Sequence, residues 1–288
     1  MRLKSLLDAG KFVVTTEIGG PSEMNYDVSP QVIRGLREWA DGVRLSPSQG
    51  QVQIPWSRLC SSIRESGLAV EMEVRVRQSN RLQLTQTLLD AANSGVENFL
   101  LFTKDYCISG ESLHELLYFS VDTEKFFSVA TSLRQGVTVD GMRLKDRPHL
   151  FVGAGVDHQA PAHARKSQLT QLERLVERGV GYFVTRPVFD SNDFSRFMDT
   201  IQGLKVPVIA EIIPVRSAGE AWALKDWPWV TIPFGFIERL QKAEDSSENP
   251  FKPTMELIER LRSMCAGIHV IPFGNVAHLA TFIKSIKK

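Results

Sequence analysis

Cysteine is scarce in this sequence of 288 residues, and no two cysteines lie close together in the sequence. The three cysteines, Cys60, Cys107 and Cys265, lie far apart and form no CxxC motif. A scattered, odd set of this kind argues against a disulfide framework and against a structural zinc site, and it fits a reducing compartment. Cys107 has no histidine placed to activate it, so we interpret it as a bystander and not as a nucleophile.

Long apolar runs and an excess of one charge are also missing. No run approaches the length of a membrane span, and residues 1–11 mix Lys and Asp with short apolar pairs, unlike a signal peptide. The formal net charge of +1 gives no electrostatic reason to expect a nucleic-acid or anionic-membrane partner. With 43% hydrophobic and 23% charged residues, the composition is typical of a globular protein, and we expect a cytoplasmic one.

What the chain does contain is an alternation of short apolar runs with segments of helical period. The expected strands are Phe12–Glu17, Gly42–Leu45, Ala69–Val76, Asn98–Phe102, Leu150–Gly155, a strand from Tyr182, Val206–Ile213 and Ile268–Ile271. The expected helices are Pro30–Trp39, Trp56–Ser66, Asn80–Ser94, Asp122–Arg134, Ala162–Arg178, Ser191–Gly203, Ser217–Trp227, Pro233–Ala243, Thr254–Cys265 and Asn275–Ile286, with a long loop over 106–121.

Repeated strand-then-helix units of this length select a closed barrel or a doubly wound open sheet. The break after the first strand, Ile18-Gly19-Gly20-Pro21, lacks the spacing of a glycine-rich phosphate fingerprint, which weakens the dinucleotide-binding open sheet. No nicotinamide motif is readable elsewhere. The sequence therefore predicts an α/β fold, a single (β/α)8 TIM barrel that forms one domain over 1–288.

The stretch Leu150–Asp190 is the clearest of these units. A helical segment separates two apolar runs, and Gly179 stands where a helix end needs a left-handed residue. The two strands end in residues suited to contacting a ligand, namely Ala154 and Gly155 in one and Arg186 in the other. In parallel barrels the functional residues gather at this carboxyl edge.

The third expected strand carries unusual charge. Over Ala69–Val76 the apolar residues occupy one face, and Glu71, Glu73, Arg75 and Arg77 occupy the other. We expect the charged face either to line a polar cavity or to face solvent.

Two carboxyl groups follow expected strands and are candidates for chemistry. Glu17 ends the first strand, where burial could raise its pKa and suit it to general acid catalysis, although a solvated strand-end charge is an equal alternative. Asp105 follows the fourth strand and could hydrogen-bond the nitrogens of a heterocycle. A turn aspartate is the commoner reading of that residue.

Three other features have both a functional and a structural interpretation. Arg186 could clamp a carboxylate or phosphate, or it could pair with an acid such as Glu211 or Glu73. Phe189 could form a stacking wall for a flat ring, although core packing is commoner for a lone Phe. The loop histidines, His158 and His163, lack a third ligand, so metal binding is not expected.

With these residues placed, the chain resembles the methylenetetrahydrofolate reductase family, flavin-dependent (β/α)8 enzymes of one-carbon metabolism. The strongest likeness is Leu150–Asp190, with its Phe-Val-Gly-Ala-Gly strand end and its Thr-Arg-Pro-Val-Phe-Asp segment. Thr16-Glu17 before a Gly-Pro break and Ile212-Ile213-Pro214-Val215 are further matches, and 230–240 and 271–286 match more loosely.

The resemblance implies that Glu17 is the general acid that protonates a folate nitrogen, so that the methylene bridge opens to an iminium. It implies a catalytic Asp105 that contacts the pterin and tunes a flavin, FAD or FMN, with Arg186 and Phe189 near the substrate. Hydride from the reduced flavin would then give 5-methyltetrahydrofolate. The cofactor contacts implied are Arg44, Glu73, Arg75, Thr103, Lys104, Asp105, Tyr118, Ala154, Gly155, Gln168 and Arg186.

Several flavin contacts depart from the family pattern together. Arg186 stands where a glutamine is usual, Glu73 replaces a histidine, Gln168 replaces an aspartate, and Glu211 occupies a common glycine position. Three hypotheses therefore stay open: a flavin-dependent folate reductase, a flavin-free folate-binding methyl-transfer or demethylase-type enzyme, and a barrel subunit that docks onto a redox or corrinoid partner. Self-association into a homo-oligomer is open as well.

Overall fold

The computed structural model of the chain describes residues 3–18, 30–46, 56–74, 76, 79–101, 113–227, 229–246, 249–273 and 282. Its strands are β1 (Val13–Ile18), β2 (Gly42–Leu45), β3 (Ala69–Val74), β4 (Asn98–Leu101), β5 (Phe151–Val156), β6 (Val180–Pro187), β7 (Val208–Ile212) and β8 (Gly267–Val270). Its α-helices are α1 (Leu3–Asp8), α2 (Pro30–Leu36), α3 (Trp56–Glu65), α4 (Arg81–Asn93), α5 (Leu113–Arg134), α6 (Arg165–Glu177), α7 (Ser191–Ile201), α8 (Ala218–Leu224), α9 (Phe234–Asp245) and α10 (Lys252–Leu261). Short 3-10 helices, Ala162–Ala164 and Gln202–Leu204, precede α6 and follow α7.

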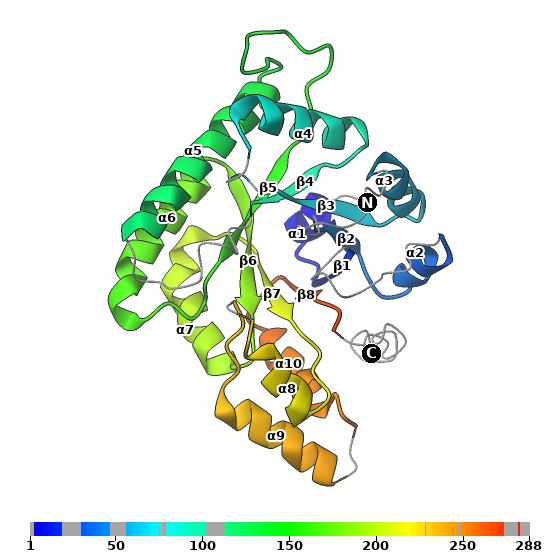
Figure 1. Ribbon diagram of the computed structural model, residues 1–288, viewed down its shortest axis with the longest axis vertical. Coiled ribbons are helices and arrows are strands. Elements are labelled where there is room, and N and C mark those ends of the chain that lie inside the picture. Colours follow the sequence, from blue (N-terminus) through cyan, green and yellow to red (C-terminus); the bar gives the residue numbers. More distant parts are fainter. Residues whose placement is uncertain are drawn as a thin grey trace.

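The strands form a closed parallel barrel in chain order (Figure 1). Each strand pairs with the next one, and β8 pairs with β1 to close the ring. Helices stand outside the ring between successive strands, so the predicted (β/α)8 TIM barrel is confirmed. A parallel closed sheet of this kind puts the carboxyl ends of all eight strands at the same rim.

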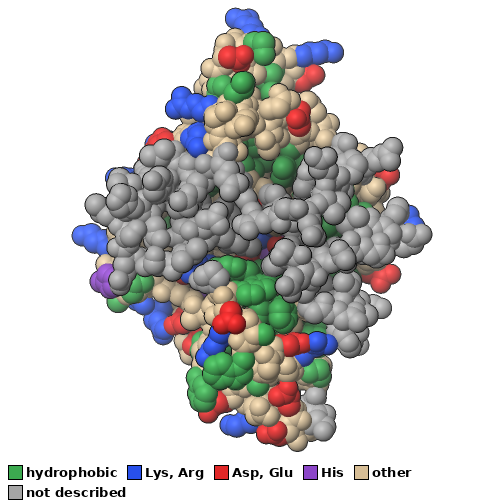
Figure 2. All heavy atoms as spheres, viewed as in Figure 1, with side chains coloured by type: hydrophobic (Ala, Val, Ile, Leu, Met, Phe, Trp, Pro, Cys, Tyr) green, Lys and Arg blue, Asp and Glu red, His purple; other side chains and the backbone are tan. Residues whose placement is uncertain are grey.

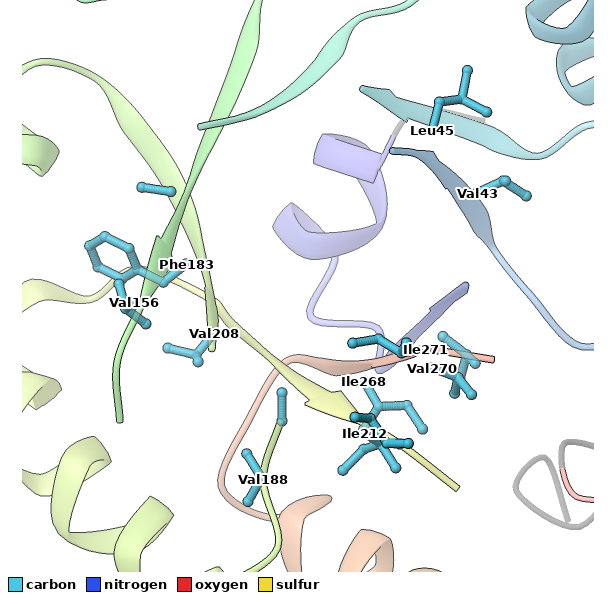
Figure 3. Packing of buried hydrophobic residues seen from close by; sticks show 14 of the residues in the cluster. Val43, Leu45, Val156, Phe183, Val188, Val208, Ile212, Ile268, Val270 and Ile271 are labelled. Carbon is cyan, nitrogen blue, oxygen red and sulfur yellow. The ribbon is translucent and has the colours of Figure 1, made fainter. Parts of the chain in front are cut away.

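The main hydrophobic core lies between the strands and the surrounding helices. Alternate strand residues point outward and pack there, as Figure 3 shows for Val43 on β2, Phe183 on β6 and Val208 on β7. The other alternate residues point inward. A period of two along each strand therefore divides the sequence into an apolar outer set and an inner set that fills the barrel.

The N-terminal helix α1 closes the amino end of the barrel. Leu3, Leu6 and Leu7 form one buried cluster with inward residues of five strands, which are Val13, Ala69, Leu100, Tyr182, Val184 and Ile209. Figure 1 draws α1 against the ring of strands. The sequence pattern gave no helix here. Each leucine buried in this way contributes about 1.5–3 kcal/mol, so we infer that α1 is an integral floor of the barrel.

Two sequence expectations on helix starts are wrong. The helix expected from Asp122 begins at Leu113, and Asp122 lies inside α5. The residues 113–121 contain no Gly or Pro and include three Leu and a Glu, which are strong helix formers. The helix expected to be capped by Ser191 is capped by Asp190, whose carboxylate accepts from the Asn192 N–H at 2.7 Å.

Other expectations lie partly outside the described residues. Of the expected helix Asn275–Ile286, only Phe282 is described; it is helical and buried. None of the described helices is long and apolar enough to cross a membrane. On the face drawn in Figure 2, blue and red side chains are interspersed around the edge, in keeping with the small net charge.

Candidate active site

The barrel interior above the floor is polar, which is unusual for a closed barrel of this size. Inward positions on β1, β2, β3, β7 and β8 carry six charged or titratable side chains, and each is almost fully buried. These residues are Glu17 on β1, Arg44 on β2, Glu71 and Glu73 on β3, Glu211 on β7 and His269 on β8. Glu71 and Glu73, from the charged face of β3, therefore face the barrel interior and not solvent, whereas Arg75 and Arg77 lie outside the described residues.

Arg44 is the centre of the lower polar layer. Its Nη1 lies 2.6 Å from Oε1 of Glu211, and its Nε contacts the carboxylate of Glu71. The strand register explains the arrangement, since Arg44 is level with Glu17 on one side and with Glu71 on the other. The guanidinium thus joins β2, β3 and β7 across the barrel. Arg suits this role because its planar fork can meet two carboxylates at once.

These contacts fix the charge state of the layer. Burial by itself would raise the pKa of Glu71, but Arg44, His269 and the hydroxyl of Tyr182 outweigh it and leave that pKa below its usual value. Burial and the neighbouring Glu71 raise the pKa of Tyr182. Burial would lower the pKa of Arg44, but Glu71 and Glu211 reverse the effect and raise it. Glu71 is therefore ionised, and the hydroxyl of Tyr182 donates a hydrogen bond to its carboxylate.

Gly153 makes room for the Tyr182 ring. A Cβ atom built on Gly153 would lie 2.3 Å from Cζ of Tyr182, closer than real Cβ contacts come. The ring stacks on Phe151, with centroids 5.0 Å apart, and points its hydroxyl at Glu71. The Phe-Val-Gly-Ala-Gly strand end thus has a packing reason for its first glycine.

The upper polar layer brings two carboxylates to one hydroxyl. Ser46 follows β2, and its Oγ lies 3.0 Å from Oε2 of Glu73 and 3.3 Å from Oε2 of Glu17. All three side chains are at most 5% exposed. Glu17 is the penultimate residue of β1 and Glu73 the penultimate residue of β3, so the cluster sits at the carboxyl side of the barrel, where chemistry is expected.

His269 flanks this cluster from β8. Its Nδ1 lies 2.9 Å from Oγ1 of Thr15, and its Nε2 lies 3.6 Å from Oε2 of Glu17. Burial and the charge of Arg44 lower the pKa of His269, although Glu17 and Glu211 oppose the shift. The imidazole is therefore neutral near pH 7, and it can offer Nε2 either as a donor or as an acceptor, depending on its tautomer.

At the rim of β5 and β6, Arg186 forms an ion pair with Asp157. Its Nη1 lies 3.1 Å from Oδ2 of Asp157, and Gln168 Nε2 donates to the Asp157 carbonyl oxygen at 2.5 Å. Burial lowers the pKa of Arg186 to about 10. Burial also raises the pKa of Asp157, partly offset by the N–H of Gln159.

The structure buries two other residues that the resemblance implied for the site. Phe189 is 1% exposed and packs edge-on against Phe236, with ring centroids 5.2 Å apart. Ala154 points outward into the same hydrophobic layer. The remaining expected positions, Arg75, Thr103, Lys104, Asp105 and the side chain of Tyr118, lie outside the described residues.

The described residues do not fit a flavin well. The Arg44 guanidinium is held by two carboxylates inside the barrel, and Gln168 and Arg186 are both engaged at Asp157. Glu73 contacts Ser46 beside a second carboxylate, which is a poor setting for a phosphate-bearing cofactor. Among the described residues, no group of His, Cys, Asp and Glu is arranged to hold a metal ion.

Sequence reasoning missed four participants: Thr15, Ser46, Tyr182 and His269. The side chains of Tyr182 and His269 lie on the inward side of their strands. Strand alternation alone could therefore have identified them as polar residues inside the barrel. Ser46 had a weaker signal, since it only follows a short strand. Its role depends on the register that sets Glu17 and Glu73 on either side.

The comparisons with known proteins agree with this architecture. The model of the methylenetetrahydrofolate reductase family matches residues 47–284. No curated protein matches. An uncharacterized protein from Clostridium thermocellum, solved with two copies of 5-methyl-5,6,7,8-tetrahydrofolic acid, aligns with a TM-score of 0.65 and 16% identity over 99% of this chain and 98% of that one.

Other solved barrels are similar in fold only. Oxaloacetate acetylhydrolase aligns with a TM-score of 0.56 and 12% identity, over 99% of this chain and 84% of that chain. Phosphonopyruvate hydrolase in complex with oxalate and Mg²⁺ aligns with a TM-score of 0.55 and 11% identity, over 99% and 83%. At such identities these similarities concern the barrel and say nothing of shared chemistry.

Proposed function

The chain belongs to the methylenetetrahydrofolate reductase family, and from this premise we propose that it binds a reduced folate at the carboxyl rim of the barrel and acts on its one-carbon unit. The observation that carries the proposal is the placement of Glu17 near the carboxyl end of β1, almost fully buried and bordered by Ser46 and His269. The folate ligand of the C. thermocellum protein, which shares the fold over nearly the whole of both chains, supports the same ligand class.

We assign Glu17 as the general acid. Its proton passes to a folate nitrogen of 5,10-methylenetetrahydrofolate, the bond from that nitrogen to the methylene carbon breaks, and the other nitrogen forms the iminium. A buried carboxyl next to a neutral imidazole suits this role, because a general acid needs to hold its proton near the working pH. Asp105 is proposed to hydrogen-bond the pterin. Reduction of the iminium to a methyl group would also need a hydride donor, the role that the family resemblance implies for a reduced flavin.

A second candidate is a flavin-free enzyme that binds a reduced folate and transfers its methyl group. The contacts of Arg44, Gln168 and Arg186 favour it, since each of these expected flavin contacts is engaged with a protein carboxylate or carbonyl. A visible absorbance spectrum of the freshly purified protein separates the two. A flavin spectrum that is bleached by a reductant and restored by methylenetetrahydrofolate supports the reductase, whereas colourless protein that binds methyltetrahydrofolate supports the second candidate.

Glu17→Gln tests the assigned acid. We expect turnover of methylenetetrahydrofolate to fall by about 10²–10⁴-fold, the usual contribution of a general acid, while binding of methyltetrahydrofolate by calorimetry changes little. Glu220→Gln on α8 is the matched control, because it makes the same change at a partly buried glutamate that pairs with Arg216 instead. Unchanged turnover in Glu17→Gln would remove Glu17 as the acid.

A further inference from the structure

The hydroxyl of Ser46 contacts two buried carboxylates but has one proton to give. Glu73 lies at 3.0 Å and Glu17 at 3.3 Å from the same Oγ atom. Since a hydroxyl can donate once and accept twice, both contacts are hydrogen bonds only if one carboxyl brings its own proton. Ser46 then donates to the ionised partner and accepts from the protonated one.

The proposed role of Glu17 as the acid decides which carboxyl carries the proton. Ser46 then donates to the carboxylate of Glu73 at 3.0 Å. Its Oγ accepts at 3.3 Å from a protonated Glu17. Two ionised carboxylates held this close in a buried layer repel each other, and such pairs share a single proton.

The surrounding charges are compatible with one proton on this pair. His269 from β8 approaches Glu17 at 3.6 Å and is neutral. Arg44 from β2 favours an ionised Glu17, but its guanidinium directly contacts Glu71 and Glu211 in the layer below. The imidazole and the guanidinium thus border the pair from two sides.

We propose that Glu73 is a positioning residue that keeps Glu17 protonated through Ser46. The inference rests on the proposed role of Glu17 as general acid. When the Glu17 proton passes to the folate nitrogen, the electron pair of the broken carbon–nitrogen bond stays on that nitrogen. Glu17 and Glu73 then both carry a negative charge beside the Ser46 hydroxyl, until a proton from solvent protonates Glu17 again. Glu73 stands where the resemblance places a histidine that contacts the cofactor. In this chain it instead helps Glu17 to keep its proton.

The direct test is infrared spectroscopy of the protonated carboxyl stretch as a function of pH. We expect wild-type protein at neutral pH to show a band that Glu17→Gln lacks. In Glu73→Gln, which keeps the size of the side chain but not its charge, the same band should disappear at lower pH than in the wild type. No Glu17-dependent band at neutral pH, or a band whose titration Glu73→Gln leaves unmoved, would overturn the proposal.

The activity test uses the same variants. We expect Glu73→Gln to lose turnover about tenfold on the alkaline side of the pH–rate profile and to recover wild-type turnover at acid pH, since acid pH restores the proton on Glu17. Ser46→Ala should behave likewise, and Ser46→Thr should restore the wild-type profile, while Glu220→Gln leaves it unchanged. A uniform loss at every pH would show a structural effect only and contradict the proposal.

The two readouts distinguish this inference from the proposed function. If the wild type turns over no folate yet shows the Glu17 band and its Glu73-dependent shift, the proton-sharing pair stands and the proposed function fails. If folate is turned over but the band does not respond to Glu73→Gln, the proposed function stands and the role of Glu73 is wrong. Urea unfolding of each variant confirms that the folded protein is the species measured.

Discussion

The floor of the barrel and the half above it are stabilised by different physics. The floor is a cluster of aliphatic side chains from α1 and the inward strand positions, whose contacts are short-range and without direction. The upper half is a set of buried ions and hydroxyls in which each group depends on a named partner. A hydrophobic floor tolerates small changes gradually, whereas a buried ionic layer fails when one partner is lost.

The difference also separates stability from function. Burying ions costs free energy whereas burying leucines is favourable, and an apolar replacement of a whole ion pair is often neutral or stabilising. A polar layer directly beneath the carboxyl rim therefore suggests a role other than stability. We infer that the Arg44 layer holds Glu17, Glu73 and His269 in place, while α1 supplies stability from below. Variants in the two regions should behave differently, and three measurements check this.

The largest effect is expected for Arg44→Met. The variant leaves Glu71 and Glu211 without the cation that lies between them, so we expect a loss of roughly 3–5 kcal/mol in the free energy of unfolding at pH 7, measured by urea titration. Folate binding should weaken as well, because the upper layer rests on this one. The difference from wild type should shrink as the pH falls, because protonation of Glu71 removes the charge that Arg44 stabilises. A loss below about 1 kcal/mol would mean that the layer is not an ionic unit.

A smaller effect, confined to stability, is expected for Leu6→Ala. Leu6 is 4% exposed within the floor cluster, and its truncation should cost about 2–4 kcal/mol through lost burial and a residual cavity. Affinity for methyltetrahydrofolate should stay unchanged where the protein is folded. Leu82→Ala on α4 is the control, since that leucine is 63% exposed and should cost less than about 0.5 kcal/mol. Weakened folate binding in Leu6→Ala would contradict the separation of floor and rim.

The fold could be predicted from the sequence because it depends on repeated local patterns. Strand alternation and helix periods identified the eight strands, and the missing glycine fingerprint favoured the barrel over the open sheet. The helix α1 could not be predicted, because its six residues are too few to show a helical period. The start of α5 was missed because a tyrosine and a nearby glycine suggested a loop.

The candidate site could be predicted only in part, since its contacts depend on register between strands. The sequence indicated that Glu17 lies at a strand end and that Glu73 alternates with apolar residues. It did not indicate that Arg44 is level with both Glu17 and Glu71, nor that Ser46 would meet two carboxylates. Those facts follow from how neighbouring strands are staggered around a closed ring, which no single segment encodes.

The smallest effect expected is a pH dependence that originates outside the barrel interior. His158, in the loop after β5, is 4% exposed, and burial lowers its pKa to about 4 despite the opposing charge of Asp190. The unfolded chain takes up this proton near pH 6.5, whereas the folded protein takes it up only near 4, so stability should fall as the pH drops through that window. His269, whose pKa is also lowered, should contribute in the same direction from inside the barrel.

His158→Leu separates the two histidines. The variant keeps an apolar contact to Phe194, whose ring centroid lies 6.3 Å from that of His158, and it removes one titrating group. We expect the plot of unfolding free energy against pH between 6.5 and 4.5 to flatten by on the order of 1 kcal/mol per pH unit. The remaining slope then belongs to His269 and the layer around Arg44. An unchanged slope of unfolding free energy against pH would mean that His158 does not contribute to the acid sensitivity. The groups of the polar upper half of the barrel would then be its source.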